Sequence, residues 1–197
     1  RDLHSFPTRR SSDLVLTWGA VEALPFDSPD RLVPAAAALR ERMKGVLLPA
    51  GLAAEVREAL AGMEPGAYSV RSSSTLEDLA GAAFAGQHDT YLNCVGVEEI
   101  LDRIRACFIS LWQDRAVAYR HSRGFGQRGA AMAVVVQRMV RCDTAGVGFS
   151  VDPIAGRDAM LINADWGLGE SVVGGESEVD QFVVDRKSSV LDRKSVV

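Results

Sequence analysis

Apolar residues recur every three or four positions in two stretches of the first third of the chain. In residues 34–45, PAAAALRERMKG, this spacing predicts a helix that ends at Gly45 and carries three apolar side chains on one face, Ala36, Leu39 and Met43. Residues 52–63, LAAEVREALAGM, repeat the pattern with Leu52, Val56 and Leu60. Residues 15–66 are therefore predicted to form a helical lead-in region.

The longest helical pattern runs from about Val97 to Arg123. Its apolar residues are again spaced by threes and fours: Val97, Ile100, Leu101, Ile104, Phe108, Leu111 and Trp112. Two glutamates stand at its start, two arginines stand near its end, and Gly124 follows, which suits the helix dipole. One continuous helix is therefore expected over this range.

After this helix the pattern shortens to β-branched segments that are separated by turn residues. The segments are AMAVVVQRMV (131–140), AGVGFSV (145–151), AMLINA (159–164) and DQFVVD (180–185), and AYSV (67–70) is a similar segment ahead of the helix. Strands joined by such short connections are mostly antiparallel. The predicted fold class is α+β, with a mostly antiparallel sheet and helices on one side of it.

Composition excludes several classes of function. The chain has 197 residues, of which 47% are hydrophobic, so it can bury a substantial core. Its net charge of −4 gives no basic face for nucleic acid, and no apolar run approaches the roughly 20 residues that cross a bilayer. The three cysteines (Cys94, Cys107 and Cys142) match neither a zinc spacing nor a disulfide framework, so a reducing, cytoplasmic setting is expected.

The two ends of the chain differ in character from the rest. RDLHSFPTRRSSDL at the start and DRKSVV at the end resemble translated sequencing-adaptor read-through. The opening shows no periodicity, and DRKS occurs twice, at 185–188 and 192–195. Residues 1–14 and 188–197 are therefore expected to be adaptor-derived tails, with ordinary frayed termini as the alternative.

Polar and small residues are concentrated in VRSSSTLEDLAGAAFAGQHDTYLN, residues 70–93. Arg71 offers a permanent cation with a planar fork that suits two phosphate oxygens. Hydroxyl donors follow it at positions 72–75, and Gly81 and Gly86 let the backbone approach a ligand closely. These residue types indicate a phosphate-binding segment, although an ordinary serine-rich turn would have a similar composition.

Other motifs give weaker signals. No standard P-loop can exist between Gly45 and Arg186, because that range contains no lysine. The glycine-rich segment GLGESVVGG (167–175) has the wrong spacing for a dinucleotide fingerprint, and a flexible connection between strands would explain it equally well. His88 and His121 are the only histidines outside the tails, and neither fits a nucleophile arrangement. No catalytic or metal-binding residue is predicted.

Four ordered motifs resemble the ATP-binding domain of the phosphoenolpyruvate synthase and pyruvate phosphate dikinase family, which rifampicin phosphotransferases share. The motifs are VRSSSTLEDLAGAAFAGQHDTYLN, VVVQRMV, GVGFSVDPIAG and INADWGLGESVVGGESEVDQFVV, and together they run from about Tyr68 to Arg186. The resemblance implies an ATP-grasp-like fold with a mixed, mostly antiparallel sheet. It assigns residues 67–187 to a partial nucleotide-binding domain that is incomplete at both ends.

The resemblance also implies roles for individual residues. Arg71 would clamp the triphosphate of ATP, and Gly86 and Thr90 would lie on the loop that covers the phosphates. Gln137 would line the nucleotide pocket. An amide that closes the apolar run 134–136 also needs a hydrogen-bonding partner if it is buried. Glu170 of GLGE is a weaker candidate, equally well explained as a loop carboxylate near solvent.

Departures from the family pattern limit what the chain is expected to do. Family members carry three features that this sequence does not show: a glycine-rich segment with an ATP-contacting lysine, an acidic metal ligand and a Gln-x-Arg-Pro motif. The chain is therefore expected to be the ATP-binding fragment of an ATP-dependent dikinase-type phosphotransferase, a transferase with kinase activity. With Mg²⁺, its parent would phosphorylate a histidine on a swivelling domain on the way to pyruvate, an antibiotic hydroxyl or another acceptor. A nucleotide-binding module without turnover and a purely structural fragment are the alternatives.

Overall fold

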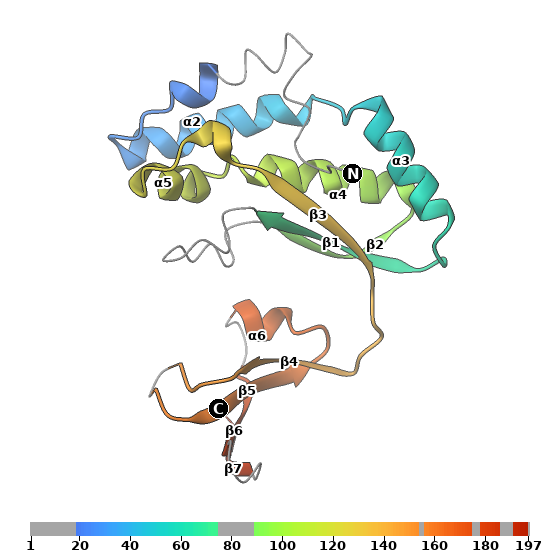
Figure 1. The fold of residues 1–197 in the computed structure, drawn as a ribbon, viewed down its shortest axis with the longest axis vertical. Helices are drawn as coiled ribbons and strands as arrows, with labels where there is room; N and C mark the ends of the chain where they lie inside the picture. The colour runs from blue at the N-terminus through green and yellow to red at the C-terminus, as the bar shows by residue number, and fades with distance from the viewer. Residues whose placement is uncertain (1–18, 75–88, 154–155, 175–177, 186–190, 197) are drawn as a thin grey trace. The chain divides into compact units, whose positions relative to one another are not determined.

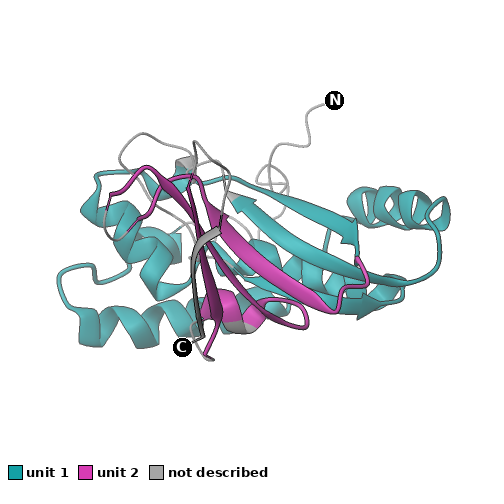
Figure 2. Cartoon of the chain, turned by 90° about the horizontal axis from the view of Figure 1, so that it is seen from below, with its two compact units in different colours: residues 1–139 teal, residues 140–197 magenta. Residues whose placement is uncertain are grey.

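The structure is a computed structural model that describes residues 19–74, 89–153, 156–174, 178–185 and 191–196. The chain divides into two compact units, residues 1–139 and residues 140–197 (Figure 2). Each unit has its own sheet. The α+β class and the antiparallel pairing predicted from the sequence are confirmed, but the strands form two small sheets instead of one.

The first unit is built on a three-stranded sheet in the order β2-β1-β3 (Figure 1). Its strands are β1 (Ala67–Ser74), β2 (Thr90–Val95) and β3 (Met132–Arg138), and both pairings are antiparallel. Helix α4 (Val97–Ser110) packs against all three strands. Every second side chain of the strands points toward α4 and packs against its apolar side chains, so this face of the sheet is buried.

The helices at the start of the chain agree with the predicted pattern. Helix α2 (Pro29–Lys44) is followed by Gly45 and buries one stripe of side chains, Leu32, Ala36, Leu39 and Met43. Helix α3 (Ala50–Ala61) is followed by Gly62, and its apolar residues Leu52, Val56 and Leu60 are partly buried against the same core. Both helices thus use the apolar spacing that predicted them.

The prediction of a single helix from Val97 to Arg123 is wrong, because the structure has two helices there, α4 and α5 (Asp114–Ser122). The chain turns at residues 111–113, and Gln113 is extended, with φ −63° and ψ 144°. The carbonyl groups freed at this corner accept hydrogen bonds from distant arginines. Arg120 Nη2 donates to Leu111 O at 2.5 Å, and Arg40 Nη1 donates to Trp112 O at 3.0 Å. These contacts satisfy backbone groups that would otherwise have favoured a continuous helix.

The second unit is a four-stranded antiparallel sheet in the order β4-β5-β6-β7. The strands are β4 (Thr144–Phe149), β5 (Ala159–Trp166), β6 (Asp180–Asp185) and β7 (Leu191–Val196), and the short helix α6 (Glu170–Gly174) lies between β5 and β6 in the chain. Strand β7 falls inside residues 188–197, the range expected to be an adaptor-derived tail. The adaptor origin of both ends stays a prediction, and residues 1–14 lie outside the described residues.

Gly146 marks a close approach between β4 and β5. A Cβ atom at this position would lie 2.6 Å from the carbonyl oxygen of Asn163 and 3.2 Å from Cβ of Ala164. At Gly148, two residues along the same strand, the nearest atom would be 4.0 Å away. The side chain of residue 146 therefore has no room, whereas residue 148 can accept a methyl group.

We expect Gly146→Ala to lower the free energy of unfolding of the second unit by about 1–3 kcal/mol, because strand β5 must shift to relieve the overlap. Amide hydrogen exchange of strands β4 and β5 in increasing denaturant measures this change. Gly148→Ala is the matched control and should be neutral or slightly stabilising. Equal destabilisation by the two variants would contradict the close approach.

Within the described residues, no helix combines the length and the apolar character that crossing a membrane requires.

Candidate functional site

Three of the four predicted nucleotide-binding residues share one face of the first sheet. Arg71 on β1 is the register partner of Thr90 on β2, and Gln137 on β3 is the partner of Ser69. Register partners point to the same face, and so do residues two apart on a strand, so these side chains lie on a common face. That face is the one opposite α4, since Val70 between Ser69 and Arg71 is fully buried in the core.

The geometry of the face follows from the register. Arg71 and Thr90 are directly opposite each other, and Gln137 is a diagonal neighbour of Arg71, at a separation of about 7–8 Å. Arg71, Thr90 and Gln137 are all exposed. Gly86 lies outside the described residues.

The Arg71 guanidinium is available to an anion. In the described part of the chain, no carboxylate lies within salt-bridge distance of it, whereas Arg57, Arg105 and Arg157 each pair with an acidic side chain. Its register partner on β3 is Val135, which is 47% exposed. A cation that pairs with none of the described carboxylates and lies beside an exposed apolar side chain can contact a ligand that has both a charged and an apolar part.

Gln137 does not need the buried partner that its apolar surroundings suggested. Strand β3 alternates, with Val134 and Val136 turned to the core and Gln137 exposed. Its backbone carbonyl accepts a hydrogen bond of 3.3 Å from Ser69 Oγ. The side-chain amide of Gln137 is therefore presented on the same open face as Arg71.

The glycine-rich segment belongs to the second unit and forms a tight turn followed by α6. Gly167 and Gly169 have φ of 86° and 78°, a region that other residues rarely adopt. A Cβ atom at Gly169 would also lie 3.0 Å from Cβ of Ala145. Backbone geometry thus explains both glycines, and Glu170 is exposed at the start of α6.

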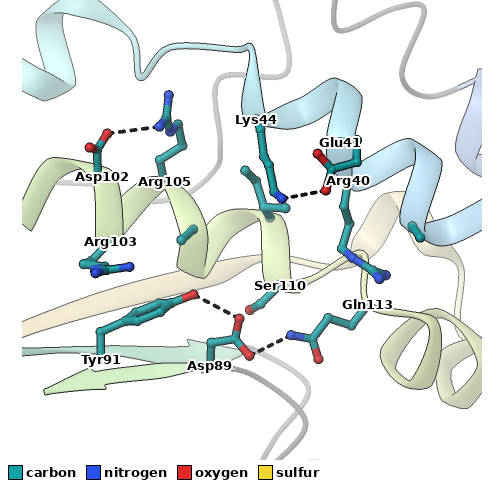
Figure 3. Close-up of a pocket in the computed structure, with 13 residues that line it drawn as sticks. Arg40, Glu41, Lys44, Asp89, Tyr91, Asp102, Arg103, Arg105, Ser110 and Gln113 are labelled. Atoms are coloured by element: carbon teal, nitrogen blue, oxygen red, sulfur yellow. Dashed lines mark hydrogen bonds and ion pairs between the residues drawn. The ribbon is translucent and has the colours of Figure 1, made fainter. Parts of the chain in front are cut away.

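A cavity of about 520 Å³ opens within the first unit, on the helix side of the sheet (Figure 3). Both acidic and basic residues line it, and ion pairs join Lys44 to Glu41 at 2.5 Å and Arg105 to Asp102 at 3.0 Å. Arg40 lies 3.6 Å from Asp114. Because each basic side chain of the lining already has an acidic partner, the cavity has no strong preference for a polyanion.

At the floor of this cavity lies a carboxylate that the sequence interpretation missed. Asp89 Oδ1 accepts a hydrogen bond of 2.7 Å from Gln113 Nε2, and Asp89 Oδ2 accepts one of 3.0 Å from the Tyr91 hydroxyl (Figure 3). Burial and then the neighbouring Asp89 charge raise the pKa of the Tyr91 hydroxyl well above its usual value, so the hydroxyl keeps its proton. The only signal in the sequence was the position of Asp89 directly before Thr90.

A second cavity of about 400 Å³ belongs to the second unit. Its walls include three carboxylates and two aromatic rings: Asp165, Glu178, Asp180, Trp166 and Phe182. Like charges repel, so this acidic lining disfavours a phosphate. The face that carries Arg71 is therefore the better candidate for a phosphate ligand.

The cysteines of the first unit are not candidates for nucleophilic catalysis. Cys94 and Cys107 are buried, and burial raises the pKa of the Cys107 thiol to about 12. The thiolate, which is the reactive form, is therefore scarce at neutral pH. Among the described residues, no group of three acidic, histidine or cysteine side chains is placed to hold a metal ion.

Comparison with known proteins shows the family to which the chain belongs. A family model described as pyruvate phosphate dikinase, AMP/ATP-binding domain, matches residues 19–197. The chain is 42% identical over 168 residues to a phosphoenolpyruvate synthase of Helicobacter pylori, covering 81% of the chain and 21% of that protein. It is 40% identical over 185 residues to a phosphoenolpyruvate synthase of Pseudomonas aeruginosa, covering 90% of the chain and 23% of that protein. A probable phosphoenolpyruvate synthase of Pyrococcus abyssi is 37% identical over 183 residues, with 87% of the chain and 22% of that protein covered. The chain thus spans about a fifth of the length of these relatives.

Proposed function

Because the chain belongs to the family of the pyruvate phosphate dikinase AMP/ATP-binding domain, we propose that it supplies the ATP-binding part of a dikinase-type phosphotransferase. In the whole protein, ATP would phosphorylate a carrier histidine on a separate swivelling domain, which would pass the phosphate to an acceptor such as pyruvate. The cytoplasm is the compartment we propose for this activity. A rifampicin-type antibiotic phosphotransferase would use the same ATP-binding part with another acceptor.

The observation that carries the proposal is the pairing of Arg71 with Thr90 on the open sheet face. A guanidinium can hold two phosphate oxygens at once, and a hydroxyl directly opposite can donate to a third. Gln137, diagonal to Arg71 on β3, can add an amide contact to another part of the nucleotide. Phosphoryl transfer depends mainly on positioning and charge neutralisation, so a rigid sheet is a suitable base for such contacts.

The magnesium ion of such a reaction would neutralise charge between the phosphates. No cluster of potential ligands for it exists among the described residues, and we assign none of them to a metal. The contribution proposed for this chain is limited to holding and orienting the nucleotide.

We expect the 197-residue chain to bind ATP weakly and to transfer no phosphate. Arg71, Thr90 and Gln137 provide one side of a site. They cannot replace contacts from another side, because each acts through the exact placement of its own polar group. Titration calorimetry with ATP measures the binding. Incubation with Mg²⁺ and labelled ATP, followed by a search for labelled protein or released phosphate, measures turnover.

A heat-treated sample is the control for turnover. Complete absence of ATP binding would contradict the proposed function. Turnover clearly above the control would show that the chain holds a complete catalytic site. If a full-length protein that carries the chain binds ATP without turnover, the result would favour a pure nucleotide-binding module.

A further inference from the structure

The Arg71–Thr90 pair is the last rung of the β1–β2 ladder. Strand β2 begins at Thr90, and β1 continues to Ser74 without a further partner in β2. Among the strands that the structure describes, β2 is at the edge of its sheet and has β1 as its one neighbour. End rungs of edge strands open more easily than central ones, so this pair needs support from outside the ladder.

Asp89 supplies that support through its backbone. Its carbonyl oxygen accepts a hydrogen bond of 3.0 Å from Ser72 Oγ, which extends the β1–β2 contact one residue beyond the last rung. Ser72 follows Arg71, and Asp89 precedes Thr90. This hydrogen bond therefore joins the two residues that are next in sequence to the residues of the proposed phosphate site.

The side chain of Asp89 connects the same point to the helices. Its two carboxylate oxygens accept hydrogen bonds from Tyr91 on β2 and from Gln113 at the corner between α4 and α5. Arg115 on α5 lies 3.9 Å from it and adds a favourable charge. A carboxylate accepts at both oxygens at once, which no neutral side chain of the same size can do.

We propose that Asp89 is a positioning residue that fixes the Arg71–Thr90 rung to the α4–α5 corner, so that both side chains present their phosphate-binding groups in one arrangement. The link to phosphate rests on the proposed function. The link between Asp89 and the rung rests only on the hydrogen bonds of the structure.

Amide hydrogen exchange of the 197-residue chain tests the positioning itself. We expect Asp89→Ala to speed exchange at Arg71, Ser72 and Thr90 by about tenfold. The two hydrogen bonds to the Asp89 carboxylate are lost, and the hydrogen bond from Ser72 Oγ to the backbone carbonyl of residue 89 is weakened because that carbonyl is no longer held in place. Tyr91→Phe removes a single donor and keeps the ring, so it should speed exchange at the same amides by a smaller factor. This variant keeps the test decisive if Asp89→Ala fails to fold.

Asp102→Ala is the matched control, since Asp102 lines the same cavity but forms its ion pair with Arg105 on its own helix α4. It should leave the exchange of the three amides unchanged. Unchanged exchange in both Asp89→Ala and Tyr91→Phe would overturn the proposal whether or not the chain binds ATP.

A second measurement compares ATP with adenosine by titration calorimetry. We expect Asp89→Ala to weaken ATP binding by about three- to tenfold and to leave adenosine binding unchanged, because only phosphate contacts depend on the rung. Equal loss for both ligands, or no loss of ATP affinity despite faster exchange, would overturn the role toward phosphate. Absence of ATP binding by the unsubstituted chain would instead refute the proposed function.

Discussion

Replacing Arg71 with alanine in a full-length protein that carries this chain is expected to weaken ATP binding by about 10- to 100-fold, the range that corresponds to losing a charged hydrogen-bonded contact of about 1.5–3 kcal/mol. Phosphate transfer should fall at least as much, because the same fork positions the triphosphate for reaction. Equilibrium binding of ATP and steady-state kinetics measure the two effects. Adenosine, which has no phosphate, should bind equally well to both proteins.

Lysine at position 71 would restore the charge without the planar fork, so partial recovery is expected. Arg57→Ala is the matched control, because Arg57 is an arginine of the same unit that pairs with Glu98 at 3.0 Å, away from the open sheet face. It should bind ATP normally. Full activity of the alanine variant at position 71 would remove Arg71 from the site.

Replacing Arg120 with alanine is expected to lower the free energy of unfolding of the first unit by about 2–4 kcal/mol. Arg120 is fully buried, donates to Leu111 O and to Gln127 Oε1, and lies 5.4 Å from the centre of the Trp112 ring. The alanine variant would leave both oxygens unsatisfied and would open a cavity. Denaturant unfolding monitored by circular dichroism measures the loss.

Arg120→Met separates the two causes, since it fills most of the space but donates no hydrogen bond. A loss close to that of the alanine variant would assign the effect to the unsatisfied oxygens, and a small loss would assign it to packing. Arg123→Ala is the control, because Arg123 has a comparable contact of 5.3 Å with the Tyr119 ring but is exposed. A neutral Arg120→Ala would contradict the structural role of this residue.

The charge of Arg120 has a cost that depends on pH. Burial lowers the pKa of Arg120 to about 10, below its value in an unfolded chain. The folded state therefore holds this proton less tightly than the unfolded state, and the charge opposes folding at neutral pH. That opposition declines only as the pH rises above about 10, so the hydrogen bonds must compensate for it under ordinary conditions.

Sequence patterns predicted the elements whose contacts are local. The spacing of Ala36, Leu39 and Met43 fixed the face of α2 that is buried, and the range predicted for β6 agrees with the structure. Strand β2 was not predicted, because its alternation is interrupted. The register with β1 is irregular between Tyr68 and Val70, and Asn93 has a positive φ of 56°.

Tertiary contacts decided what the sequence could not show. The corner between α4 and α5 depends on Arg40, which is far from it in sequence, so the apolar spacing alone predicted one long helix. The motifs placed Arg71, Thr90 and Gln137 on segments that the structure brings to one sheet face. Sequence patterns did not indicate a role for Asp89, because that role depends on Gln113, which is 24 positions away.

The division into two sheets has a consequence for spectroscopy. Each unit holds a tryptophan in a different environment, since Trp112 in the first unit is 8% exposed and Trp166 in the second is 79% exposed. A buried indole emits at shorter wavelength than a hydrated one, so these two tryptophans contribute distinct components to the emission of the folded chain. Trp18, which lies outside the described residues, also contributes to that emission. If the two sheets melt separately, the short-wavelength and long-wavelength signals follow different transitions, and a single melting temperature does not describe the chain.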